Sequence, residues 1–189
     1  MKTTFFLIVF IFSANTLFGQ EIKIGFQDSI QSPQLNENRK FIIKLPNGYN
    51  NTDKSYPVLY RLDGNLDIYF ETLAAVNRLV YMEESMPEMI VVMIENTNRN
   101  RDMMPTNTSF FKSEPGAENF KIFIENELIP HINNTYRTNN DNILCGQSLS
   151  AIFTLYYFLT GSEQFDSFIA CSGGFPDCET YFTNLTDNF

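Results

Sequence analysis

The segment MIVVMIEN, residues 89–96, constrains the fold of this chain most, because it is apolar at every position from Met89 to Ile94. A strand without alternation has both faces buried, as in a parallel sheet lying between layers of helices. The segment YPVLYRLDG, residues 56–64, is also almost continuously apolar from Val58 to Leu62. Both segments therefore predict central strands of a sheet that is covered on its two faces.

In the segments between the predicted strands, apolar residues repeat at helical spacing. The predicted strands are 21–26 (an edge strand), 40–46, 56–62, 89–96, 143–145 and 165–172, and the predicted helices are 66–81, 117–132 and 149–160. Pro130 is expected to bend or end its helix, and the segment after Cys178 shows no closing strand or helix pattern. This alternation predicts one α/β domain with a mostly parallel sheet.

The first twenty residues, MKTTFFLIVFIFSANTLFGQ, have the pattern of a secretory signal. Lys2 gives a positive start, and the apolar run Phe5–Phe12 is too short for a membrane-spanning helix but fits a signal core. We predict a signal peptide at 1–20 and a domain at 21–189 that is secreted or periplasmic, with no membrane partner after cleavage. A buried N-terminal strand or a membrane anchor is the alternative.

Charge and cysteine content argue against nucleic acid and metal ions as partners. The chain carries 22 acidic and 13 basic residues, a formal net charge of −9, and such a surface repels polyanions. Cys145, Cys171 and Cys178 are too few and too irregularly spaced for a zinc site or a disulfide scaffold. In an oxidising compartment, Cys171 and Cys178 could close a small loop.

The segment DNILCGQSLSAIF, residues 141–153, contains the candidate catalytic serine. A short apolar strand runs into Gly146-Gln147-Ser148-Leu149-Ser150, which approximates the motif G-x-S-x-G, and a helix follows. In that motif the serine occupies a strained turn between strand and helix, so its neighbours two positions away must be small. Ser148 is therefore either a nucleophile or a helix N-cap without chemistry, since serine is also a good cap.

Two backbone amides are candidates for stabilising an oxyanion near Ser148. The Leu149 amide would lie at the N-terminus of a helix, where N–H groups are unpaired and the partial charge is positive. Gly64, in the turn after the strand at 56–62, is a possible second donor. For Gly64, a plain turn glycine is the alternative.

Four ordered segments carry a resemblance that covers about Lys40 to Gly174. They are YPVLYRLDG, IVVMIENTNRNRDMMPT, ENFKIFIENELIPHINNTYRT and ILCGQSLSAIFTLYYFLTGSEQFDSFIACSGG. The chain resembles the esterase family of the α/β-hydrolase superfamily that includes enterochelin esterase-like and esterase D-like proteins. The resemblance implies a serine hydrolase that cleaves carboxylic esters without a metal or organic cofactor. It implies Ser148 as nucleophile, Leu149 as oxyanion amide and the Asp63-Gly64 turn as the region of the second amide.

The chain departs from the family pattern in its acid and base. Ser150 stands where the family has Gly or Ala, and the family order of Ser, then Asp or Glu, then His is not met, because no histidine follows Ser148. His131, the sole histidine, precedes the nucleophile strand and is expected at the opposite edge of the sheet. Asp166 and Asp177 are expected to be structural.

These observations predict a secreted serine esterase that lacks its last strands, its last helix, its acid and its base, and is weakly active or inactive by itself. The expected substrate is a small-molecule or polysaccharide-linked ester. A non-catalytic secreted binding domain on a hydrolase fold is the alternative, and an acyltransferase is a weaker one. Arg101 and Asp102, on the loop after the strand at 89–96, are expected to form a structural ion pair or to line the pocket. The oligomeric state stays open.

Overall fold

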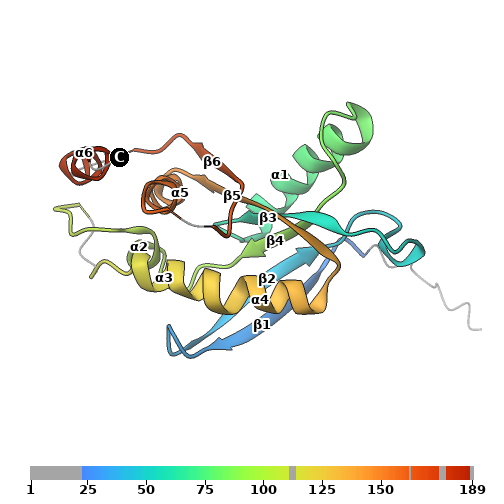
Figure 1. Ribbon diagram of the computed structural model, residues 1–189, viewed down its shortest axis with the longest axis horizontal. Helices are drawn as coiled ribbons and strands as arrows, with labels where there is room; N and C mark the ends of the chain where they lie inside the picture. The colour runs from blue at the N-terminus through green and yellow to red at the C-terminus, as the bar shows by residue number, and fades with distance from the viewer. Residues whose placement is uncertain (1–22, 111–113, 162, 175–177, 188–189) are drawn as a thin grey trace, which may run out of the picture.

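The computed structural model describes residues 23–110, 114–161, 163–174 and 178–187 (Figure 1). Six strands form one sheet in the order β1-β2-β4-β3-β5-β6. Their bounds are β1 Phe26–Ser32, β2 Glu37–Lys44, β3 Tyr56–Arg61, β4 Ile90–Ile94, β5 Thr138–Gln147 and β6 Ser167–Cys171. β4, β3, β5 and β6 are parallel, whereas β1 and β2 are antiparallel to their neighbours. The predicted α/β fold with a mostly parallel sheet is confirmed.

Helices lie on both faces of the sheet (Figure 1). The elements are η1 Tyr49–Asn51, α1 Leu66–Asn77 with the π-helical turn η2 Arg78–Met82, α2 Arg99–Met103, α3 Ala117–Phe123, the π-helical turn η3 Ile124–Leu128, α4 Ile129–Thr135, α5 Leu149–Leu159 and α6 Glu179–Thr186. α3, η3 and α4 follow one another directly, so Pro130 lies in the first turn of α4 and does not end the helical stretch. None of the helices in the described part of the chain has the length and apolar character that crossing a bilayer requires.

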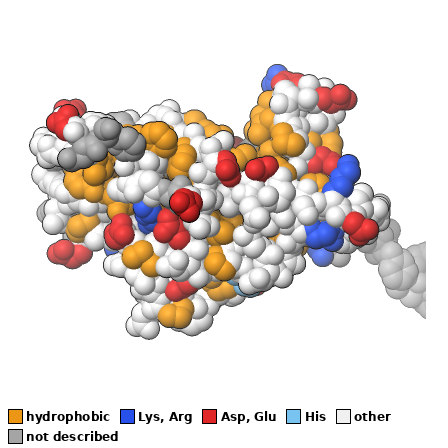
Figure 2. Space-filling model, viewed as in Figure 1, with side chains coloured by type: hydrophobic (Ala, Val, Ile, Leu, Met, Phe, Trp, Pro, Cys, Tyr) orange, Lys and Arg blue, Asp and Glu red, His pale blue; other side chains and the backbone are white. Residues whose placement is uncertain are grey.

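The central strands bury both faces, as their uninterrupted apolar sequences predict. In β4, Ile90, Val92 and Ile94 belong to the larger core, which the helices α3 to α6 cover. Val91 and Met93 point the other way, into a smaller core under α1. Hydrophobic side chains also reach the surface on and after α1 (Figure 2), where Leu66, Phe70 and Met82 are exposed.

Three predictions about the ends of the chain need comment. The edge strand begins at Phe26, where its residues pair with β2. Residues 23–25 of the predicted strand are not in a strand, and residues 21 and 22 lie outside the described residues. The segment after Cys178 forms the helix α6, with Phe182 buried, although we expected no closing helix there. The predicted signal peptide at 1–20 lies outside the described residues. Cys145, Cys171 and Cys178 form no disulfide among the described residues.

Candidate active site

The structure places Ser148 on a sharp turn between β5 and α5. Its φ of 57° and ψ of −121° lie in a region that residues other than glycine seldom adopt. The side chain is exposed and forms no capping hydrogen bond with the helix. These features match the strained strand-to-helix turn of a serine nucleophile, and they do not support the alternative of a simple N-cap.

The backbone around this turn explains why its neighbours must be small. A Cβ atom at Gly146 would lie 2.2 Å from the Ser150 carbonyl oxygen and 2.5 Å from Thr154 Oγ1. The Ser148 N–H donates to the Cys171 carbonyl oxygen of β6 at 2.9 Å. Leu149 is the first residue of α5, where the helix has no internal acceptor for its first amides.

Asp63 lies at the carboxyl end of β3, beside the Ser148 turn, and its carboxylate is the centre of a polar cluster. It accepts hydrogen bonds from Arg99 Nε at 2.7 Å and Nη2 at 2.9 Å, and from Asn96 Nδ2 at 2.7 Å. Ser150 Oγ donates at 2.8 Å to Asp63 Oδ2, the oxygen that also accepts from Arg99 Nη2. Burial by itself raises the pKa of Asp63, but the hydrogen bonds from Arg99, Asn96 and Ser150, with the charge of Arg99, outweigh it and hold the pKa below its ordinary value.

Gly64, in the turn predicted as a possible region of the second oxyanion amide, lies where that turn approaches β4. The Gly64 N–H already donates to the Ile94 carbonyl oxygen at 2.7 Å. A Cβ atom at this position would lie 2.7 Å from backbone carbons of Met93 and Ile94. Glycine is therefore required here by the close approach of the turn to β4, and its amide is engaged in that contact.

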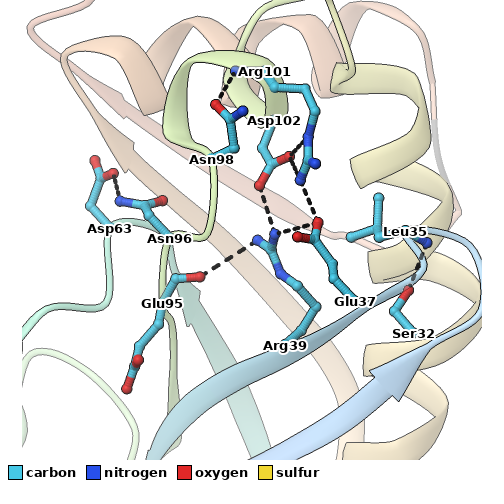
Figure 3. Close-up of polar contacts among 10 residues, drawn as sticks. All are labelled: Ser32, Leu35, Glu37, Arg39, Asp63, Glu95, Asn96, Asn98, Arg101 and Asp102. Atoms are coloured by element: carbon cyan, nitrogen blue, oxygen red, sulfur yellow. Dashed lines mark hydrogen bonds and ion pairs between the residues drawn. The ribbon is translucent and has the colours of Figure 1, made fainter.

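A second polar cluster supports the loop that carries Arg99 (Figure 3). Arg39 and Asp102 are both fully buried and form an ion pair at 2.8 Å. Arg101 pairs with Asp102 at 2.6 Å and also contacts Glu37. The guanidinium of Arg39 lies 5.0 Å from the ring centre of Phe120. Arg101 and Asp102 are thus a structural ion pair, which is one of the two predicted alternatives.

His131 lies far from the serine, as predicted. Its Nε2 is 3.2 Å from Asp28 Oδ2 on β1. Because β2, β4 and β3 separate β1 from β5, this contact is roughly 19 Å away across the sheet at the usual strand spacing. Asp166 is also structural, since its carboxylate accepts from the Asn142 N–H at 3.0 Å. Asp177 lies outside the described residues.

A cavity of about 540 Å³ opens beside the Asp63-Gly64 turn. Its polar side chains lie at the ends of β3 and β4 and on β1, and its apolar ones come from β1 with the residues just before it, from β2 and from α1. The set is Ile24, Gly25, Phe26, Gln27, Ile42, Gly64, Asn65, Leu66, Tyr69, Glu95 and Asn96. Size and mixed lining suit a small organic group. In the described part of the chain, His, Cys, Asp and Glu side chains form no cluster able to hold a metal ion.

Sequence reasoning missed that Arg99, Asn96 and Ser150 converge on Asp63. Asp63, Asn96 and Ser148 each follow a strand of the parallel sheet, and the ends of such strands share one edge. Their position after parallel strands therefore indicated that these three residues lie close together. The specific partners depend on how the loop after β4 folds, which no local pattern specifies.

Comparison with known proteins agrees with this geometry. A family model described as "Putative esterase" matches residues 32–179. The ferri-bacillibactin esterase BesA of Bacillus subtilis (strain 168) is 29% identical over 155 residues, which cover 71% of this chain and 53% of that protein. The chain thus spans about half the length of this curated relative.

Two solved structures are also similar to this chain. An IroE-like serine hydrolase from Shewanella oneidensis is 30% identical with a TM-score of 0.78, over 87% of this chain and 55% of that one. The BES protein from Bacillus cereus, 24% identical, shares the fold with a TM-score of 0.76 over 92% of this chain and 71% of its own. Since the family model covers most of the sequence, the chain belongs to the putative esterase family.

Proposed function

We propose that this chain carries the nucleophile of a serine esterase, and that Ser148 forms the acyl-enzyme. The observation that carries the proposal is the exposed, strained Ser148 turn between β5 and α5. In the reaction the Ser148 oxygen attacks the ester carbonyl carbon and its proton passes to a base. The bond to the alcohol then breaks, and water later releases the acid.

Leu149 is the proposed oxyanion amide. It begins α5, so its N–H lies at the positive end of a helix of 11 residues. A negative charge that develops on the substrate oxygen above Ser148 is stabilised by such an amide. A second amide donor is not assigned, because the Gly64 N–H donates to Ile94.

The base and acid of the reaction are proposed to come from polypeptide that these 189 residues do not include. The sole histidine, His131, contacts β1 at the far edge of the sheet. Relatives that match the chain are nearly twice as long as the matched region. Loss of triad members lowers turnover by about 10⁴–10⁶-fold in serine proteases, so the 189-residue chain alone is expected to be a very weak esterase.

The proposed substrate is an ester of the siderophore class, or a similar small-molecule or polysaccharide-linked ester outside the cytoplasm. Three observations support it: the name of the Bacillus subtilis relative, the cavity beside the Asp63-Gly64 turn, and the secretory pattern of residues 1–20. The proposed active part of the chain is the domain at 21–189.

A fluorophosphonate probe tests the proposal without requiring turnover. The Ser148 oxygen attacks phosphorus and displaces fluoride while the hydroxyl proton passes to water, and the adduct resembles the charged tetrahedral intermediate. We expect one adduct per chain that forms slowly, because no base lies in reach among the described residues, that maps by mass spectrometry to Ser148, and that is absent from Ser148→Ala. Hydrolysis of p-nitrophenyl acetate by the same protein should be far below that of ordinary esterases.

Two results would contradict the proposal. Labelling at another residue, or no adduct at Ser148 even after long incubation with a high probe concentration, would favour the alternative of a non-catalytic binding domain. Turnover within about tenfold of ordinary esterases that disappears in Ser148→Ala would keep the nucleophile but show that the chain holds its own base.

A further inference from the structure

We infer that Ser150 is a positioning residue, whose hydroxyl clamps the nucleophile turn to the Asp63 carboxylate. The inference rests on the proposed role of Ser148. Ser150 Oγ lies 2.8 Å from Asp63 Oδ2 and 2.9 Å from the Gln147 carbonyl oxygen, and it accepts the Gln147 N–H at 2.8 Å. A single hydroxyl therefore joins the residue before the nucleophile to the end of another strand.

The steric needs of the turn do not explain this hydroxyl. Gly146 is the position at which any Cβ would collide with α5, and a residue without a hydroxyl at 150 would satisfy the requirement for a small neighbour. Burying a hydroxyl costs free energy unless it is paired. Ser150 is 0% exposed, and its hydroxyl pairs with both the turn and a carboxylate, so the contact has a specific effect on the turn.

Asp63 is held firmly enough to act as the fixed end of this clamp. Arg99 binds both of its oxygens, and Asn96 binds one of them. Hydrogen bonds to an ionised group are shorter and stronger than neutral ones. The clamp thus joins the carboxyl ends of β3, β4 and β5, and it holds the strained Ser148 turn against relaxation toward ordinary backbone angles.

We expect Ser148 to react more slowly when the hydrogen bond between Ser150 and Asp63 is removed. Ser150→Ala should reduce the second-order rate of fluorophosphonate labelling at Ser148 about tenfold, as expected for loss of one hydrogen bond to a charged group. Asp63→Asn should reduce it by a similar or larger factor. The double variant should label no more slowly than Asp63→Asn, because both substitutions open the same contact.

Thr154→Val is the matched control. Thr154 is also a fully buried hydroxyl residue of α5, but its Oγ1 donates to the Ser150 carbonyl oxygen and has no contact with Asp63 in the described hydrogen bonds. This variant should label within about twofold of the unmodified protein. Thermal unfolding of every variant identifies rate losses that come from unfolding.

A second readout does not depend on reactivity. Carbon NMR of the Asp63 carboxyl group measures its pKa in the full chain, which should rise in Ser150→Ala and stay unchanged in Thr154→Val. The clamp is overturned if Ser150→Ala leaves both the labelling rate and the Asp63 pKa unchanged, or if both variants slow labelling equally. If the unmodified chain is not labelled at Ser148, the proposed function fails, and the NMR result alone decides whether Ser150 binds Asp63 as described.

Discussion

The Ser148 turn has more polar contacts on the side that faces β3 and β4 than on the side that faces β6. Toward β3 and β4, the turn meets Ser150 and Asp63, both buried and both fully engaged in hydrogen bonds. Toward β6, its contact is the Ser148 N–H to the Cys171 carbonyl oxygen. β6 is an edge strand whose apolar residue Ile169 is 40% exposed.

The difference indicates that the side facing β3 and β4 positions the nucleophile, whereas the groups that activate it belong on the side facing β6. The inner side holds the serine in a strained conformation and presents a helix N-terminus, so it supplies geometry and electrostatics. In the family order the acid and base follow later strands, which would join the sheet beside β6. Within the described residues, that side of the sheet carries neither group in reach of Ser148.

The largest expected effect is on the inner side, at Gly146. Gly146→Ala places a Cβ atom 2.2 Å from the Ser150 carbonyl oxygen, and overpacking of this kind costs about 1–3 kcal/mol or more. Urea unfolding should show this loss of stability, together with loss of Ser148 labelling. Gly174→Ala is the matched control, because a Cβ there meets nothing within 4 Å. Equal stability of the two variants would mean that the turn is not tightly packed.

A smaller effect is expected from the ionisation of Asp63. Its folded-state pKa is lowered, chiefly because hydrogen bonds from Arg99, Asn96 and Ser150 outweigh a desolvation effect that alone would raise it. The stabilisation is therefore complete above the unfolded pKa of about 3.9 and is lost as the pH falls through the folded value. The stability difference between the unmodified protein and Asp63→Asn should shrink below about pH 4. Urea unfolding from pH 7 to pH 2.5 measures it, and a constant difference would contradict the described cluster.

The smallest effect on stability is expected on the outer side. Ile169→Thr on β6 keeps a β-branched residue and replaces the ethyl branch of a side chain that is already partly exposed with a hydroxyl. We expect a change in unfolding free energy within about 0.5 kcal/mol and less self-association, because exposed apolar edge strands promote pairing between chains. Sedimentation velocity tests the second point. A large loss of stability would show that the β6 edge is more buried than its exposure indicates.

The sequence predicted the parts of this molecule whose patterns are local. β3 and β4 were evident because their apolar runs are uninterrupted, and the Ser148 turn because strand, small residues and helix are adjacent. β1 was misplaced, since the half-buried Asp28 interrupts an alternation of Phe26 and Ile30 that would have marked the strand. α6 was missed because it is short and buries a single residue, Phe182.

The polar clusters could not be predicted in the same way. Arg99, Asp63 and Ser150 come from three segments, and their contact depends on how the sheet brings the segments together. The pair Arg39 and Asp102 is separated by 63 positions in the chain. Charge pattern alone gives no sign that both side chains are fully buried, since charged residues are usually exposed.

The most direct test of the account is to identify the residue that becomes acylated when the chain is incubated with p-nitrophenyl butyrate. With the nucleophile positioned and no base in reach, the account predicts a single butyryl group per chain, on Ser148, that forms slowly and persists because deacylation is also slow. Tandem mass spectrometry locates the group. Acylation at another residue, or rapid turnover that persists in Ser148→Ala, would contradict the claim that this turn is the reactive centre.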